Sequence, residues 1–244
     1  MSPGQTASVV VRAQNTGNTT WNKTGANPVR LGTYAPIDRQ SPLATGQWIS
    51  PSRPAGLSES TVEPGGTGTF EFPISIPQNR SSLNERFDLL AEAAAWMEGA
   101  TADFSMQVNQ NYSWVPISQY AYTNSSKTTP ANLHDLDPGQ TIYVGFVAQN
   151  TGNTTWYKGG RFPFNTGASR PYDRVSQFSA SGWISPSRPA NMIETSVPPG
   201  GTGTFEFNLK APLVTGSYKE YFNILSEVNQ WLPDPGLYFD TTVQ

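Results

Sequence analysis

Residues 13–21 read Ala-Gln-Asn-Thr-Gly-Asn-Thr-Thr-Trp, and the same nine residues recur unchanged at 148–156, an offset of 135 (148 minus 13). Two further stretches recur at the same offset, and they are 48–55 with 183–190 and 64–72 with 199–207. A period of this length belongs to a whole domain and not to a solenoid repeat. The sequence therefore predicts two copies of one module in tandem.

The residues ahead of the repeated turn alternate in character. Val9 and Val11 alternate with polar or outward positions, as do Val144 and Phe146 in the second copy. A period of two is typical of strands that bury one face of an antiparallel sheet. Asn, Gly and Pro-Gly clusters between many short strands favour a sandwich. We therefore predict an all-β chain of two antiparallel immunoglobulin- or fibronectin-like β-sandwiches.

One stretch, 89–96, is rich in Leu and Ala and is tempting as a helix. Its counterpart, 224–231, has poorer helix formers and includes the β-branched Val228. Because both copies must share one fold, we predict strands in both places.

The predicted modules are residues 1–108 and 109–244. The segment 112–137 has no counterpart ahead of residue 3. Its first part predicts the opening strand of the second module, and the polar remainder predicts a loop. The first module is therefore expected to lack its first strand, and we expect the chain to be part of a longer protein.

Composition argues against several classes of partner. Charged residues make up 14% of the chain and the net charge is −3, without a basic block for nucleic acid. No apolar run approaches the roughly 20 residues that cross a bilayer. The absence of Cys excludes disulfides, thiolate metal sites and Cys nucleophiles. We expect no nucleic-acid partner, no membrane span and no cofactor.

The sequence offers little for catalysis or metal binding. His134 is the only histidine, and it has no equivalent in the first copy. Glu71 and Glu206 alternate with apolar Phe residues, which predicts a solvated sheet face and not a paired-acid cleft. Asp135 and Asp137 are too few for the oxygen ligands of calcium. We expect no enzyme and no metal site.

The repeated Pro-rich loops are the best candidate for binding. Trp and Arg are residue types that anchor interfaces, and an exposed Trp can stack on a sugar. Alternatively, each Trp closes one end of its own sandwich, with Arg stacked on it and paired to Asp. The acidic neighbours are expected to form local pairs with the Arg that follows them. The candidate residues are Asp38, Arg39, Trp48 and Arg53, with Asp173, Arg174, Trp183 and Arg188 in the second copy.

Several motifs together carry a family resemblance. They are Asn15, Gly17 and Trp21, Pro64 and Gly65, Ala211 and Pro212, Gly216 and Tyr218, and the late Trp96 and Trp231. This pattern resembles the four-tryptophan immunoglobulin-like domain of selective-autophagy cargo receptors and of bacterial multidomain surface or secreted proteins. The first copy departs from it, with Ile76-Pro77 and Leu83 in place of Ala-Pro and Gly-x-Tyr. The resemblance covers most of both copies and implies binding or spacing without chemistry.

These features predict a non-catalytic, extracellular or cell-surface module pair that acts as a spacer, adhesion or presentation element. One alternative is a carbohydrate- or cell-wall-binding appendage of a hydrolase, whose partner would be a surface glycan. Another is a cargo-type module whose partner would be a protein.

Overall fold

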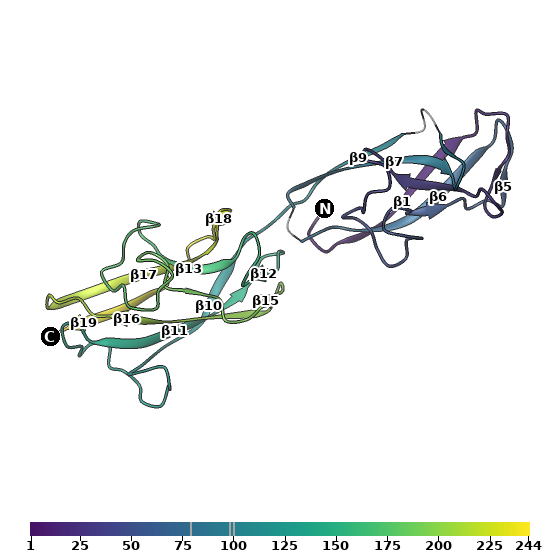
Figure 1. Cartoon of the computed structure of the whole chain (residues 1–244). Coiled ribbons are helices and arrows are strands. Elements are labelled where there is room, and N and C mark those ends of the chain that lie inside the picture. The colour runs from purple at the N-terminus through teal and green to yellow at the C-terminus, as the bar shows by residue number, and fades with distance from the viewer. Residues whose placement is uncertain (79, 98, 100) are drawn as a thin grey trace. The chain divides into compact units, whose positions relative to one another are not determined.

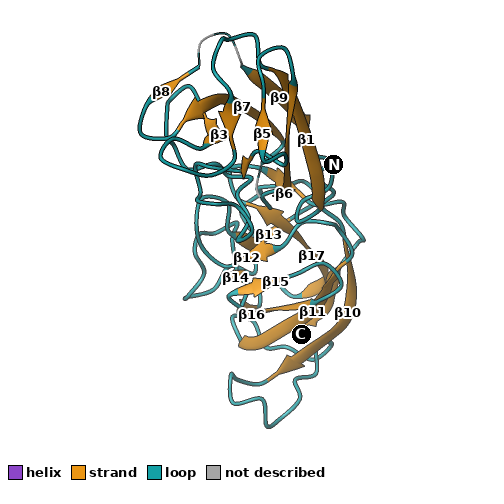
Figure 2. Ribbon diagram, turned by 90° about the vertical axis from the view of Figure 1, so that its right-hand side faces the viewer, coloured by secondary structure: helices purple, strands orange, loops and turns teal. Residues whose placement is uncertain are grey.

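The computed structural model describes residues 1–78, 80–97, 99 and 101–244. Every regular element of the described residues is a β-strand, which confirms the predicted all-β fold (Figures 1 and 2). The chain divides into two compact units, Met1–Gln110 and Asn111–Gln244, called unit 1 and unit 2 below.

Unit 1 places its strands in two main antiparallel layers. In one, β1 pairs with β6. In the other, the order is β4-β3-β7-β8, and β9 also pairs with β7. A short ladder joins β2 to β5. The strands are β1 (Thr6–Gln14), β2 (Trp21–Asn22), β3 (Val29–Thr33), β4 (Ala55–Gly56), β5 (Thr61–Val62), β6 (Thr67–Ser75), β7 (Ser82–Ala91), β8 (Ala95–Trp96) and β9 (Ala102–Gln107).

Unit 2 repeats this arrangement with one strand more. The first layer is β10-β11-β16, and the second is β14-β13-β17-β18, with β19 pairing β17. The strands are β10 (Trp114–Tyr122), β11 (Thr141–Asn150), β12 (Trp156–Tyr157), β13 (Phe164–Ala168), β14 (Ala190–Asn191), β15 (Ser196–Val197), β16 (Thr202–Lys210), β17 (Gly216–Ser226), β18 (Gln230–Trp231) and β19 (Tyr238–Val243).

The two layers of each unit enclose a core filled by the alternating apolar residues. Phe70 and Phe72 of β6 are at most 1% exposed, and Phe146 of β11 stacks on Phe205 of β16 at 5.1 Å between ring centroids. Large aromatic rings fill such a thin core with few residues. The period-two pattern thus positions the inward faces of both sandwiches.

The repeated turn is held by its asparagine. Asn15 is fully buried, and its Nδ2 donates to the carbonyl oxygens of Thr19 and Val62 at 2.9 and 3.0 Å. Its Oδ1 accepts from the amide of Gly17 at 3.1 Å. Asn150 makes the equivalent bonds in unit 2. A buried amide must be satisfied in this way, so the repetition of 13–21 has a structural cause.

Candidate functional site

The candidate Trp48 of unit 1 lies in the core. Its side chain is 7% exposed, and its Nε1 donates to the carbonyl oxygen of Pro73 at 2.6 Å. Its ring meets Phe72 edge-on at 5.6 Å and Phe87 at 6.0 Å. Because its one donor is used and its faces are packed, these contacts favour the alternative in which the loop closes its own sandwich.

Trp183 makes the corresponding contacts in unit 2, where it is half-buried and packs against the core. Its Nε1 donates to the carbonyl oxygen of Asn208 at 2.6 Å. Its ring packs edge-on against Phe207 and Phe222, with centroids at 5.9 and 6.1 Å. The two repeated loops therefore use their indole rings alike, inside their own units.

Arg53 in the same loop joins three side chains of unit 1. Its Nε lies 2.8 Å from Glu92 Oε1, and its Nη1 lies 2.5 Å from Asp38 Oδ1. Its guanidinium lies over the ring of Trp96 at 5.4 Å, and Tyr34 meets the same ring at 5.6 Å. The cation is thus paired with two carboxylates, one of them Asp38 as the alternative predicts. The predicted stacking of Arg53 on Trp48 is wrong, because Arg53 lies over Trp96 instead.

Arg188 makes the same set of contacts in unit 2. It pairs with Asp173 and, through Nε at 2.9 Å, with Glu227. Its guanidinium lies 5.0 Å from the ring centroid of Trp231, and Tyr172 stacks on that ring at 4.4 Å with an interplanar angle of 13°. Tyr172 is 45% exposed, so this stack reaches the surface.

Arg39 and Arg174 do not pair with the aspartates that precede them, and the local-pair interpretation is wrong. Arg39 instead pairs with Glu85 at 2.8 Å, and Arg174 with Glu220 at 2.9 Å. Both glutamates are nearly inaccessible, at 4% and 1% exposed. Burial is the largest effect on Glu220 and raises its pKa, against the lowering by Ser176 and Arg174. A buried carboxylate needs such a cation, so these pairs have a structural role.

A glycine under each late Trp makes the stack possible. A Cβ at Gly167 of β13 would lie 2.5 Å from the Trp231 ring, and a Cβ at Gly32 would lie 2.6 Å from the Trp96 ring.

We expect Gly167→Ala to lower the free energy of unfolding of unit 2 by about 1–3 kcal/mol, because the ring must move off the sheet. Urea unfolding measures this change. Gly159→Ala is the matched control, since a Cβ there meets nothing within 4 Å; equal losses in both variants would contradict the packing role.

Glu71 and Glu206, which the sequence predicts to lie on a solvated sheet face, differ in their exposure. Glu71 is exposed and accepts a hydrogen bond from Ser8 at 3.0 Å. For Glu206 the interpretation is wrong, because its side chain is 9% exposed and binds the hydroxyls of Tyr120 and Tyr143 and the Nζ of Lys127. The covering Tyr120 comes from β10, which has no counterpart among the described strands of unit 1.

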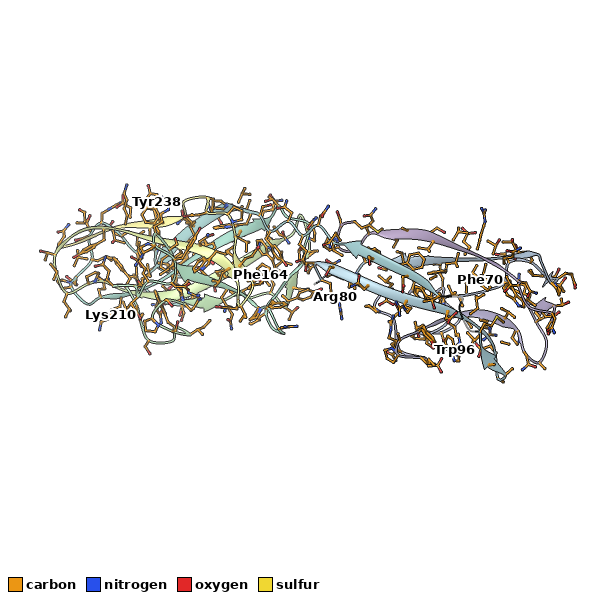
Figure 3. The ribbon with its side chains drawn as sticks, turned by 90° about the horizontal axis from the view of Figure 1, so that it is seen from above. Phe70, Arg80, Trp96, Phe164, Lys210 and Tyr238 are labelled. Carbon is orange, nitrogen blue, oxygen red and sulfur yellow. The ribbon has the colours of Figure 1, made fainter. Side chains whose placement is uncertain are left out.

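A surface that the sequence reasoning missed lies over β17 and β19 of unit 2. We call it the aromatic–cation strip, and its members are Arg170, Lys219, Tyr221 and Tyr238 (Tyr238 is labelled in Figure 3). Arg170 lies 4.5 Å from the Tyr221 ring centroid, the two tyrosines lie 5.1 Å apart, and Lys219 lies 5.0 Å from the Tyr238 ring.

The described residues of unit 1 form no such strip. Arg86 and Asp103 stand where unit 2 has Tyr221 and Tyr238, and they form an exposed ion pair at 2.5 Å. The signal that could have found the strip is this divergence between the copies: two tyrosines replace an ion pair within an otherwise repeated frame.

The described residues carry no group of three or more His, Asp or Glu side chains placed to hold a metal ion. None of the described residues forms a helix long and apolar enough to cross a membrane.

Comparison with known proteins adds one family match. Residues 129–234 match the family model described as the Ig-like domain from next to BRCA1 gene. The matched residues lie within unit 2, span less than half of the chain and agree with an immunoglobulin-like fold. A solved structure titled BspA_C_WT is 8% identical, with a TM-score of 0.24, over 100% of this chain and 93% of that chain. Comparison with curated proteins finds no match.

Proposed function

We propose that the chain is a non-catalytic pair of immunoglobulin-like modules that spaces or presents other parts of an extracellular or cell-surface protein. One observation carries this proposal: the repeated Trp/Arg loops use their functional side chains within their own units. The resemblance to four-tryptophan domains and the match of residues 129–234 to an Ig-like family model support a module of this kind.

The chemistry of the loops supports the same proposal. A ligand site needs side chains that can exchange water for ligand. Arg53 is already paired with two carboxylates, and Trp48 donates its only N–H to a backbone oxygen. Arg188 and Trp183 are engaged in the same way. The repeated residues thus stabilise two similar modules, as a spacer requires.

We propose further that adhesive contacts with a protein partner are made by the aromatic–cation strip. Tyr and Arg are among the residues that contribute most to protein interfaces. Tyr238 is 37% exposed, and Lys219 is also exposed. Arg170 pairs with Asp234 at 2.8 Å, but its side chain remains 46% exposed, whereas that of Arg53 is 13% exposed. The two tyrosine rings contact each other at 5.1 Å with an interplanar angle of 46°, so they are held in place before binding, which lowers the entropic cost of an interface.

A pull-down combined with a glycan array tests this function. The strip variant Arg170→Ala/Tyr238→Ala is expected to lose protein capture by about tenfold or more. The matched control is Arg86→Ala/Asp103→Ala, which removes the exposed pair at the corresponding place in unit 1 and is expected to bind like the wild type. Equal binding by wild type and strip variant would contradict adhesion through the strip.

One specific observation favours the carbohydrate-binding alternative. Tyr172 and Trp231 form a parallel stack, and the outer ring is 45% exposed. Glycan binding that is lost in Tyr172→Ala, with thermal unfolding unchanged, would support that alternative over the protein partner.

A further inference from the structure

In unit 2, the strands β10 and β19 face each other across a gap. Among the described strands, β10 pairs with β11 alone and β19 with β17 alone. The two facing edges are close, because Gln119 Nε2 of β10 donates to the carbonyl oxygen of Tyr238 in β19 at 2.9 Å. An unpaired strand edge presents N–H and C=O groups that can pair with another strand.

A groove of about 560 Å³ lies between these two edges. Its lining includes Leu237 and Phe239, which are each 3% exposed and belong to the core, and Leu133, which packs against that core. The exposed Gln119 and the half-buried Asp240 also line it. The groove thus combines apolar core residues with polar residues from both strands.

The pairing of β19 identifies which of its main-chain groups point into the groove. The amide of Thr242 donates to the carbonyl oxygen of Leu133 at 2.8 Å, and its own carbonyl oxygen accepts from the amide of Leu136 at 3.1 Å. Alternate residues of a strand direct their main-chain groups to the same side, so Tyr238 and Asp240 direct theirs away from β17 and into the groove. The bond that the Tyr238 carbonyl accepts from β10 agrees with this direction.

The chain itself shows what the gap between these edges accepts. At one end of the gap, the amide of Ala131 donates to the carbonyl oxygen of Ala121 in β10 at 3.1 Å. Two residues later, Leu133 accepts from Thr242 of β19. Residues 131–136 thus bond to both edges, and the groove is the unfilled remainder of the same gap.

The side chain of Gln119 makes one of the bonds that an added strand would make. Its primary amide is the same kind of donor as a peptide N–H, and it bonds to the Tyr238 carbonyl that faces the groove. Because Gln119 is exposed, its side chain can turn into solvent and leave this acceptor to a ligand. The groove therefore already recognises an amide donor at this point.

We propose that the protein partner of the aromatic–cation strip inserts an extended segment into this groove, where the segment pairs with the open edge of β19. The inference rests on the proposed adhesive function, because Tyr238 belongs to both the strip and the groove. That continuity assigns the segment to the partner of the strip. Main-chain groups at strand spacing favour a polypeptide over a glycan; their pairing gives affinity, and alternate apolar side chains over Leu237 and Phe239 give specificity.

The probe comes from a displayed library of short peptides in which Thr alternates with any apolar residue. The strongest binder is labelled, titrated into the whole chain and followed by fluorescence anisotropy. We expect saturable one-to-one binding. The same peptide with Asn at its apolar positions is expected to bind about tenfold more weakly or less, because it loses the contact with the apolar lining.

Two substitutions at one position test the main-chain pairing. Asp240→Pro removes an N–H that faces the groove and not β17, at a place where an edge strand tolerates proline, and is expected to weaken binding about tenfold or more. Asp240→Ala keeps this N–H and is the matched control, expected to bind like the wild type. Equal binding by the two variants, with both folded by thermal unfolding, would overturn the proposal.

A third variant keeps the test decisive if Asp240→Pro does not fold. Gln119→Ala frees the carbonyl oxygen of Tyr238 and is expected to strengthen peptide binding severalfold. Unchanged or weaker binding by this variant would contradict pairing at that oxygen.

Hydrogen exchange locates the bound peptide without any variant of the chain. The peptide is expected to slow exchange at the amides of Tyr238 and Asp240 and to leave that of Thr242, already bonded to Leu133, unchanged. No saturable binding at peptide concentrations on the order of 1 mM, or binding that leaves Tyr238 and Asp240 unaffected, would overturn the proposal. A neutral oligosaccharide that protects these two amides when no peptide does would also overturn it.

The strip variant separates this inference from the adhesive function on which it rests. If that variant loses protein capture while no peptide protects β19, the strip still binds protein and the groove proposal is wrong. If a peptide protects β19 while the strip variant captures protein like the wild type, adhesion through the strip is wrong.

Discussion

Replacing Trp183 with Ala is expected to lower the free energy of unfolding of unit 2 by about 3 kcal/mol, because it removes a half-buried ring that packs between the two sheets. The loss includes the edge-on contacts with Phe207 and Phe222 and leaves the carbonyl oxygen of Asn208 without its indole donor. Trp48→Ala is expected to have an effect of the same size on unit 1. Thermal or urea unfolding of the whole chain measures both.

The control for these substitutions is Tyr157→Ala, which removes an aromatic ring that is 40% exposed. It is expected to change stability by well under 1 kcal/mol, as surface substitutions do. If Trp183→Ala unfolds like the wild type and instead abolishes glycan binding, the ring is a ligand contact and the structural account of the loop is wrong.

Removing the cation from the buried pair of unit 2 is expected to have the second large effect. Arg174→Ala leaves Glu220, which is 1% exposed, without its charge partner. Breaking a buried pair in this way costs about 3–5 kcal/mol, and the remaining hydrogen bond from Ser176 places this variant near the lower value at pH 7.

The stability penalty of Arg174→Ala is expected to depend on pH. Burial raises the pKa of Glu220 in the folded unit, so the folded state holds the proton more tightly than the unfolded state. The raised pKa of Glu220 therefore stabilises the folded state at pH values below the pKa of Glu220 in the unfolded chain. This stabilisation is lost as the pH rises through the pKa of Glu220 in the folded unit. Without Arg174 the pKa rises further, so Arg174→Ala is expected to be less destabilising at pH 4 than at pH 7.

Urea unfolding at the two pH values measures the difference, with Lys210→Ala at an exposed position as the control. A penalty for Arg174→Ala that is the same at both pH values would show that the pair acts through packing alone and not through the charge of Glu220.

The fold could be predicted because it depends on local patterns. Period-two alternation and turn residues marked the inward faces, and the repeat allowed one copy to correct the other. Residues 89–96 illustrate this: β7 ends at Ala91, a turn follows, and Ala95–Trp96 pair back onto it, so the helix-favouring composition yields to the strand pairing of the fold. Tertiary context overrides helix propensity in this way.

The partners of the candidate residues could not be predicted in the same way. Arg39 and Glu85 are 46 residues apart, and only the sheet arrangement brings them together. The identity of Asp38-Arg39 in both copies suggested a local pair, but Asp38 lies in a turn with a φ of 61°, and it pairs with Arg53 while Arg39 pairs with Glu85. The strip could not be predicted from the repeat, because its tyrosines lie where the two copies differ and the repeat marks only the residues that they share.

Residue-resolved hydrogen exchange on the whole chain without ligand tests most directly the claim that unit 1 repeats the frame of unit 2 without a strand at the β1 edge. Residues 141–150 of β11 are flanked by strands on both sides, so we expect their amides to be protected throughout. Residues 6–14 of β1 are paired on one side only, so we expect fast exchange at alternate amides. Uniform protection of β1, equal to that of β11, would contradict the account.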